Sequence, residues 1–152
     1  MTEAPPGDST LVIDWNRLHR DTRLLSRRLR SAGPFKGIIA VPRGGLIPAA
    51  LVACDLGLRL VDTVCVASYD ERIQRADDPE ILKAVAGDGE GWLVIDDLVD
   101  TGNTFRRLRQ MLPAAYFATV YAKPQGAALA DLTVCPVEQA VWLIFPWDTE
   151  PS

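Results

Sequence analysis

The chain has 152 residues, 48% of them hydrophobic and 24% charged, which is typical of one globular domain with its own core. A net charge of −4 argues against general nucleic-acid binding, which depends on neutralising many phosphates with Lys and Arg. Three cysteines without a C-x-x-C pair predict no disulfide framework, and no segment approaches the ~18 apolar residues of a membrane span, so we expect a cytoplasmic protein.

The N-terminal half predicts alternating helices and strands. Residues 1–10 are polar and contain proline, which predicts a disordered tail before a single domain over residues 11–152. Asp14 can cap a helix whose apolar residues follow a 3.6-residue period and which ends at Gly33-Pro34. The following segments predict a buried strand over residues 38–41, an Ala-rich helix over residues 46–56 closed by Gly57, and a strand over residues 60–66.

The C-terminal half continues this alternation after a long connection. Residues 69–90 are charged and Gly-rich, and we expect a loop there with at most one helical turn around residues 81–85. The remaining pattern predicts a strand at residues 93–95, a helix over residues 105–112, strands at residues 116–122 and 141–145, and a short extended segment near Val134. Such alternation predicts an α/β fold with a mainly parallel central sheet flanked by helices.

The segment with the most chemical content is Asp-Asp-Leu-Val-Asp-Thr-Gly-Asn-Thr at residues 96–104. It connects a buried strand to a helix, and the first N–H groups of a helix lack intrahelical partners and attract anions such as phosphate. Hydroxyls of Thr101 and Thr104 can add donors, while Asp96 and Asp97 can accept hydrogen bonds from vicinal hydroxyls or hold a hard cation. This combination predicts a sugar phosphate as ligand.

Other polar residues follow the ends of neighbouring strands. Arg43 follows the first predicted parallel strand, Ser68 and Tyr69 the second, and Lys123 the strand after the acidic segment. In parallel sheets ligands bind beyond the carboxyl ends of the strands, so these segments and the acidic segment are expected to form one site.

The acidic segment resembles the 5-phosphoribosyl-1-diphosphate (PRPP) loop of type I phosphoribosyltransferases. Further similarity to the short bacterial purine phosphoribosyltransferases of this type lies in residues 37–46, 61–66, 68–70, 122–124 and 146–148. The chain is identified as a member of that family. The resemblance implies the type I phosphoribosyltransferase fold, with a long flexible loop and a small hood over the base.

The resemblance also implies which residues bind PRPP. Asp96 and Asp97 would contact the ribose hydroxyls, and Arg43 and Gly44 match a diphosphate-binding turn that often has a cis peptide bond. Ser68 and Tyr69 would begin the loop that closes over PRPP. The 5-phosphate would be held by Asp100, Thr101, Gly102, Asn103 and Thr104.

A purine site and a magnesium site follow from the same resemblance. Asp100 would act as general base at the purine N7, and Lys123 would donate to the 6-oxo group. Trp142 would stack on the base while the Leu143 carbonyl faces the purine 2-position, and Asp97 and Asp148 would lie at Mg²⁺. The implied activity is transfer of a phosphoribosyl group from PRPP to guanine, xanthine or hypoxanthine by a homo-oligomer, commonly a tetramer.

Simpler interpretations stay open for each residue type. An isolated Asp-rich turn often only caps a helix, a Lys before Pro is more often a surface residue, and Trp142 in an apolar strand is more often part of the core. The triplet Asp-Thr-Gly at residues 100–102 also occurs in aspartic proteases, but the helical pattern after it disfavours that class. The main alternative function is a regulator with the PRPP fold that senses nucleotides and binds nucleic acid without turnover.

The first helix is rich in arginine. A solvated face is the default interpretation; the sharper one is peripheral contact with an anionic inner membrane surface or with acidic groups of another subunit. The arginines are Arg17, Arg20, Arg23, Arg27, Arg28 and Arg30.

Overall fold

A five-stranded parallel sheet forms the centre of the molecule. The structure is a computed structural model that describes residues 9–67 and 79–148. The strand order is β3-β2-β6-β7-β8, and all four neighbouring pairs run parallel. Their bounds are β2 Gly37–Ala40, β3 Val61–Thr63, β6 Trp92–Val99, β7 Tyr116–Ala122 and β8 Leu132–Pro136. The predicted α/β class with a parallel sheet is therefore confirmed.

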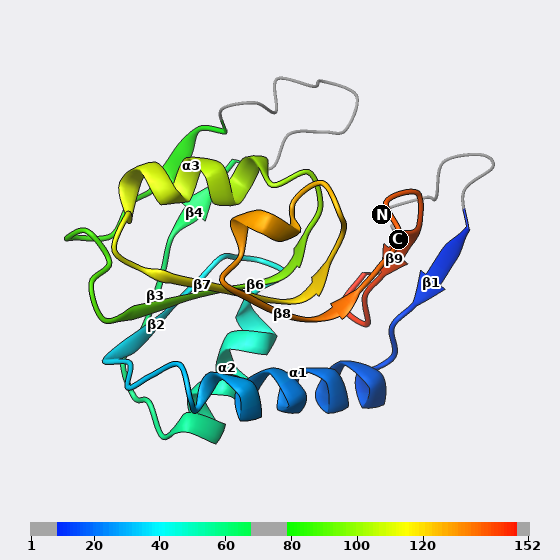
Figure 1. Cartoon of the computed structure of the whole chain (residues 1–152), viewed down its shortest axis with the longest axis horizontal. Helices are drawn as coiled ribbons and strands as arrows, with labels where there is room; N and C mark the ends of the chain where they lie inside the picture. Colours follow the sequence, from blue (N-terminus) through cyan, green and yellow to red (C-terminus); the bar gives the residue numbers. More distant parts are fainter. Residues whose placement is uncertain (1–8, 68–78, 149–152) are drawn as a thin grey trace.

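Two helices cover one face of this sheet (Figure 1). Helix α1 (Trp15–Leu29) begins where the Asp14 side chain accepts a hydrogen bond from the Arg17 backbone N–H at 2.8 Å, as the capping pattern predicts. Helix α2 (Leu46–Leu56) ends at Gly57, whose φ of 68° is the left-handed conformation that glycine adopts without strain. Their inward apolar side chains pack with the sheet into one half of the core, which includes Leu18, Leu25 and Val52.

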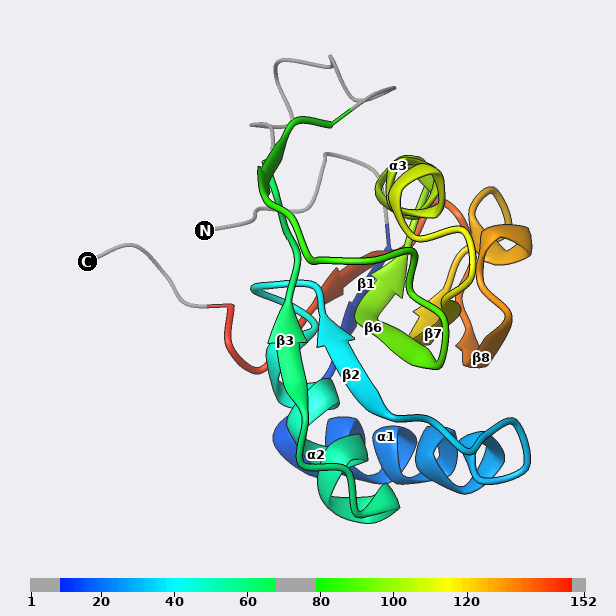
Figure 2. The same cartoon turned by 90° about the vertical axis from the view of Figure 1, so that its left-hand side faces the viewer.

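Helix α3 (Asn103–Met111) covers the opposite face, as Figure 2 shows. Phe105 and Leu108 from this helix are buried with Phe117 of β7 in the second half of the core, and the rings of Phe105 and Phe117 meet edge to face at 5.1 Å. A short 3₁₀ helix, η1 (Ala127–Leu129), follows β7 on this side. Helices thus cover both faces of the sheet, and only its side edges and the ends of its strands are left accessible to a ligand.

A separate pair of strands lies beyond the carboxyl ends of β7 and β8 (Figure 1). Strand β9 (Trp142–Ile144) runs parallel to β1 (Thr10–Val12), with Thr10 opposite Trp142. Thr10 therefore belongs to a strand, whereas the sequence assigns it to a disordered tail; residues 1–8 of that expected tail lie outside the described residues. Pairing with β9 is a tertiary contact 132 positions away in the chain, which a polar N-terminal composition does not reveal.

The structure corrects three local predictions. Residues 81–83 form strand β5 (Ile81–Lys83), antiparallel to β4 (Cys65–Val66), rather than a helical turn. The strand predicted over residues 60–66 is divided between β3 and β4. Strand β6 continues through the acidic pair to Val99, because Leu98 and Val99 still pair with Tyr121 and Ala122 of β7.

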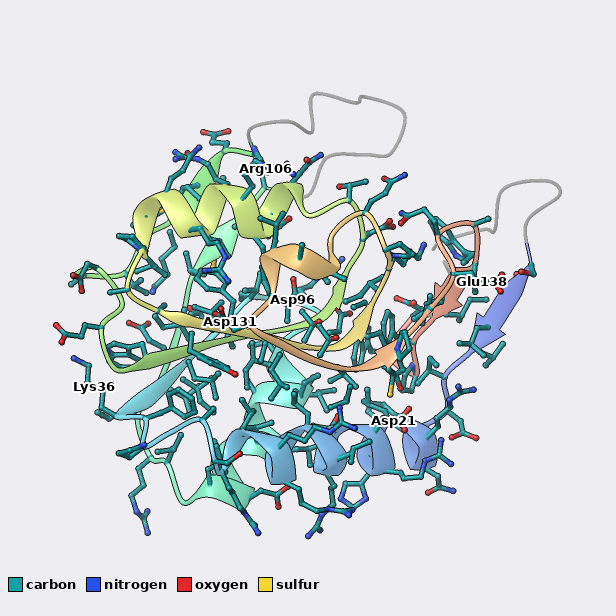
Figure 3. All side chains as sticks on the ribbon, viewed as in Figure 1. Asp21, Lys36, Asp96, Arg106, Asp131 and Glu138 are labelled. Carbon is teal, nitrogen blue, oxygen red and sulfur yellow. The ribbon has the colours of Figure 1, made fainter. Side chains whose placement is uncertain are left out.

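Helix α1 is fixed to the sheet by a buried polar contact as well as by apolar packing. Tyr121 of β7 donates its hydroxyl to Asp21 at 2.8 Å, and both residues are buried. Figure 3 shows Asp21 on the sheet-facing side of α1. Arg20 Nε lies 3.3 Å from the same carboxylate and Arg17 Nε 3.7 Å from it. Within residues 9–67 and 79–148, no helix is long and apolar enough to cross a membrane.

Candidate active site

Asp96 and Asp97 are consecutive residues of β6, the middle strand of the sheet, and both are half-buried. The Asp97 backbone N–H donates to the Asp96 carboxylate at 2.8 Å, and the Leu98 N–H donates to the Asp97 carboxylate at 2.7 Å. Figure 3 places Asp96 near the middle of the sheet. Because the backbone holds each carboxylate close to its own strand, the pair is positioned before any ligand arrives.

The acidic pair carries an unfavourable concentration of negative charge. Burial raises the pKa of Asp96 well above its usual value, and the charge of Asp97 adds to this effect. Burial also raises the pKa of Asp97, and the charge of Asp148 raises it further, although hydrogen bonds to the carboxylate act in the opposite direction. A cation or several hydroxyl donors at this place would relieve the repulsion.

The turn between β2 and α2 packs directly on this pair. A Cβ atom at Gly44 would collide with the Asp97 carboxylate, and one at Gly45 would lie 2.5 Å from the Ile95 carbonyl oxygen. The peptide bond between Pro42 and Arg43 is cis, as the resemblance implies for this turn. Arg43 itself is exposed. Glycine is required here because a side chain at Gly44 would collide with the Asp97 carboxylate and one at Gly45 with backbone atoms, and not because of an unusual φ angle.

The loop over residues 100–104 leads into α3. Gly102 precedes the helix with a φ of 92° and has no side chain to cap it, and among the described residues the N–H of Asn103 makes only a long contact of 3.5 Å with the Thr101 hydroxyl. A Cβ at Gly126, in the turn after β7, would lie 2.7 Å from the Asp100 carbonyl oxygen and 2.9 Å from the Gly102 nitrogen. The loop is therefore packed against the turn after β7, and N–H groups of the first turn of α3 remain available to an anion.

Asp100 and Lys123 form an ion pair at the ends of adjacent strands. Lys123 Nζ lies 3.3 Å from Asp100 Oδ2, and the lysine side chain is only 6% exposed whereas that of Asp100 is 48% exposed. Gln139, from the connection between β8 and β9, donates its amide to Asp100 Oδ1 at 2.8 Å. Its amide oxygen accepts the backbone N–H of Gln125 at 3.0 Å. Gln139 was not among the predicted site residues, since a single glutamine in a polar turn gives no motif.

The segment around β9 is attached to this site at both ends. Gln139 before it contacts Asp100, and the charge of Asp148 after it acts on Asp97. Asp148 also accepts the Phe145 backbone N–H at 2.8 Å. Trp142 is half-buried, and its indole Nε1 is buried without a hydrogen-bond partner among the described residues, while the Leu143 side chain is buried. The strand that carries both residues therefore lies over the same edge as the acidic pair.

Most of the predicted site residues come together at the carboxyl edge of the sheet. This edge carries Arg43, Gly44, Asp96, Asp97, the loop over residues 100–104 and Lys123. Strand β9, with Trp142 and Leu143, belongs to a separate sheet beside it, and Asp148 follows that strand (Figure 1). Ser68 and Tyr69 lie outside the described residues. Among the residues that the structure describes, there is no group of three or more His, Cys, Asp or Glu side chains that could hold a metal ion. A metal here would need oxygen ligands from its substrate besides Asp97 and Asp148.

Comparisons with known proteins agree with this architecture. Residues 14–151 match the model of the phosphoribosyl transferase domain. The xanthine-guanine phosphoribosyltransferase of Nitratidesulfovibrio vulgaris is 54% identical over 150 residues, which cover 99% of this chain and 91% of that protein. The enzyme of the same name from Desulfotalea psychrophila is 52% identical over 141 residues, covering 93% of this chain and 88% of that one.

A solved structure shares the fold across nearly the whole length. The purine phosphoribosyltransferase of Pyrococcus horikoshii superposes with a TM-score of 0.79 at 26% identity, covering 95% of this chain and 97% of its own. The parallel sheet, the acidic strand end followed by a loop and helix, and the extent of these matches lead to one conclusion: the chain belongs to the phosphoribosyl transferase domain family.

Proposed function

We propose that this protein transfers the 5-phosphoribosyl group of PRPP to a 6-oxopurine, giving the nucleoside 5′-monophosphate and diphosphate. The single observation that carries the proposal is the juxtaposition of Asp100 and Lys123 beside the acidic pair of β6. The 52–54% identity to proteins named xanthine-guanine phosphoribosyltransferase supports the same purine salvage activity.

The PRPP half of the site is supported by charge and backbone geometry. The N-terminus of α3, where Gly102 supplies no side-chain cap, offers N–H groups to the 5-phosphate, with the Thr101 and Thr104 hydroxyls as added donors. Asp96 and Asp97 can accept hydrogen bonds from the two ribose hydroxyls. Arg43, exposed in the turn beside Asp97, is suited to the diphosphate. A loop that begins at Ser68 and Tyr69 and closes over PRPP stays a prediction.

Mg²⁺ is the cofactor that fits these residues. Carboxylates of Asp97 and Asp148 supply hard oxygen ligands, and the diphosphate of PRPP would complete the coordination. Bound Mg²⁺ would screen the negative charge of the leaving diphosphate. Burial, with a smaller effect from the charge of Asp148, raises the pKa of Asp97, and a bound cation would favour the charged carboxylate instead.

The purine half uses the polar edge of a 6-oxopurine. Lys123 donates to the 6-oxo oxygen, and Asp100 accepts the proton from N7 as a ring nitrogen forms its bond to C1 of the ribose and the C1–O bond to diphosphate breaks. Both partners of the Asp100–Lys123 ion pair then find a complementary group on the base. Trp142, half-buried on β9, would stack on the ring, and the Leu143 carbonyl would face the purine 2-position.

A nucleotide-sensing regulator without turnover is not favoured. Such a protein would need an extended basic surface for nucleic acid, whereas several arginines of α1 are already engaged by acidic residues. Arg17 and Arg20 lie beside Asp21, and Arg23 lies 3.8 Å from Asp55. Assembly into a homotetramer is part of the proposal, and light scattering of the purified protein tests it.

The test is an assay of nucleotide formation from PRPP and Mg²⁺ with guanine, xanthine, hypoxanthine and adenine in parallel. We expect turnover of 6-oxopurines and very little of adenine, because the Lys123 ammonium finds no acceptor at a 6-amino group. Equal turnover of adenine and guanine would refute the purine half of the site. Absence of nucleotide with every base would refute the enzymatic function.

A further inference from the structure

Gln139 lies at the junction of three segments that the purine site requires. It follows β8, its amide nitrogen contacts Asp100 after β6, and its amide oxygen contacts Gln125 after β7. Among the described residues expected to bind PRPP or purine, none contacts both Asp100 and the Gln125 backbone as Gln139 does. Figure 3 shows its neighbour Glu138 in the connection before β9.

The two contacts of Gln139 determine which way its amide faces. The Gln125 backbone N–H can only donate, so the atom 3.0 Å from it must be the amide oxygen. A carboxylate can only accept, so the atom 2.8 Å from Asp100 Oδ1 must be the amide nitrogen. Each contact thus enforces the other, and the amide group is held as a donor toward Asp100.

The two oxygens of Asp100 are consequently not equivalent. Oδ1 accepts from a neutral amide that is anchored to the backbone, while Oδ2 accepts from the Lys123 ammonium at 3.3 Å. A 6-oxopurine offers an acceptor to Lys123 and an N7 proton to the carboxylate, so it can replace the contact at Oδ2. The contact at Oδ1 has no competitor on the base and can persist through the reaction.

We propose that Gln139 is a positioning residue that holds the Asp100 carboxylate by Oδ1, so that Oδ2 exchanges Lys123 for the N7 proton of the purine. The inference rests on the proposed function, because it assigns Gln139 an effect on the residue that accepts this proton. Gln139 contacts Asp100 and the backbone of Gln125, and its proposed effect on the reaction runs through Asp100, without binding the diphosphate or the phosphate of PRPP. Loss of its amide therefore affects the chemical step more than the binding of PRPP.

A double-mutant cycle between Gln139 and Asp100 tests this dependence. Gln139→Met keeps the length of the side chain and removes both the donor to Asp100 and the acceptor of the Gln125 N–H. Asp100→Asn removes the proton acceptor. In the unaltered background, Gln139→Met should lower the single-turnover rate with guanine by roughly 10- to 100-fold, the range of a hydrogen bond to a charged group, with KM for PRPP within about 2-fold. In the Asp100→Asn background, Gln139→Met should change the single-turnover rate by less than about 2-fold, because the side chain that Gln139 positions no longer accepts a proton.

Two further variants keep the test decisive. Gln139→Glu retains an oxygen for the Gln125 N–H but turns a carboxylate toward Asp100, so it should fold and should also be slow. Glu138→Gln changes an exposed neighbouring side chain and should leave the rate unchanged. Equal rate losses from Gln139→Met in both backgrounds, or a full rate for Gln139→Glu, would overturn the positioning role. If the unaltered protein forms no nucleotide with any base, the proposed function fails and this inference fails with it; turnover by the unaltered protein separates the two questions.

Discussion

At the residue scale, the carboxylates of the site differ in environment. Asp96 and Asp97 are half-buried beside each other, whereas Asp100 is 48% exposed and paired with Lys123. The first two are suited to hydroxyls and a cation, and the third to a proton that arrives with the substrate. Only Leu98 and Val99, the last two residues of β6, lie between Asp97 and Asp100.

For Asp100→Asn we expect kcat to fall by about 10²- to 10⁴-fold, the usual contribution of a positioned general base. Asparagine keeps the size but can accept from only one of the two donors, Lys123 and Gln139, and it cannot take the N7 proton. PRPP affinity should stay within a few-fold, as for an interaction that matters chiefly in the transition state. Single-turnover kinetics by stopped flow is the appropriate measurement, since slow product release could mask the loss. A rate near that of the unaltered protein would make Asp100 a structural residue of the loop.

For Asp97→Asn we expect weaker Mg-PRPP binding together with a more stable fold at neutral pH. Because the pKa of Asp97 is raised in the folded protein, the protonated carboxyl group favours folding. This stabilisation is complete below the unfolded pKa of about 3.9 and is lost as the pH rises through the folded pKa. Removing the charge should raise Tm at pH 7 by roughly 2–4 °C per kcal/mol gained, and the gain should shrink at acid pH. Calorimetry and a PRPP titration measure the two effects, with Glu138→Gln as control. Unchanged PRPP affinity would count against the role of Asp97.

At the element scale, the site depends on how closely the turn after β2 meets β6. The φ angle at Gly44 is not in the left-handed region, so alanine is allowed by the backbone and only its contact with Asp97 matters. Gly44→Ala should displace the Asp97 carboxylate and lower PRPP affinity at least several-fold, since overpacking of this kind typically costs about 1–3 kcal/mol.

Gly57→Ala is the matched control for this change. Gly57 has a φ of 68° with nothing within 4 Å of a Cβ atom, so alanine there is strained but touches no neighbour. It should lower the free energy of unfolding by about 1 kcal/mol and leave PRPP affinity unchanged. If both variants weakened PRPP binding equally, the effect would be global destabilisation rather than displacement of Asp97.

The attachment of α1 to the sheet gives a second prediction at this scale. Tyr121→Phe removes the hydroxyl that donates to buried Asp21, and burial together with that contact raises the pKa of the tyrosine well above its usual value. We expect the free energy of unfolding to fall by about 1–3 kcal/mol in urea titrations. Tyr116→Phe, at the start of the same strand, should cost less than about 0.5 kcal/mol. Equal losses from the two changes would show that the Asp21 contact is not stabilising.

At the scale of the whole molecule, helix α1, which carries the arginines, lies on the face of the sheet opposite α3 (Figure 1). Three of these arginines, Arg17, Arg20 and Arg23, have acidic partners. Each acidic partner reduces the positive electrostatic potential that the arginine presents to an anion in solution. Arg27 and Arg28 are exposed and have no acidic partner among the described residues. The positive surface is therefore smaller than the arginine content of the helix suggests.

We expect weak, reversible binding to anionic vesicles at low salt, at about 1 kcal/mol for each near-surface charge. Binding should fade at physiological salt, where charges are screened over about 8–10 Å. The double change Arg27→Gln with Arg28→Gln should reduce co-sedimentation, whereas Arg106→Gln, on α3 at the other face (Figure 3), should not. Equal binding to neutral vesicles would exclude an electrostatic contact.

The sequence by itself determined the elements whose signals are local. The Asp14 cap, the glycine that closes α2 and the apolar run of β7 depend on nearby residues, so their positions were predicted within one or two residues. The order of strands and helices also placed Arg43, Asp97 and Lys123 at one edge, since parallel strands with helical crossovers end on the same side.

Only the tertiary structure decided the contacts between distant segments. Strand β5 exists because it pairs with β4, and β6 extends past the acidic pair because β7 continues beside it. Gln139 contacts Asp100, 39 positions away in the chain, and Tyr121 contacts Asp21, 100 positions away. No periodicity in the sequence predicts either contact. Backbone pairing and buried hydrogen bonds depend on which segments the fold brings together, and the local pattern of a chain does not contain that information.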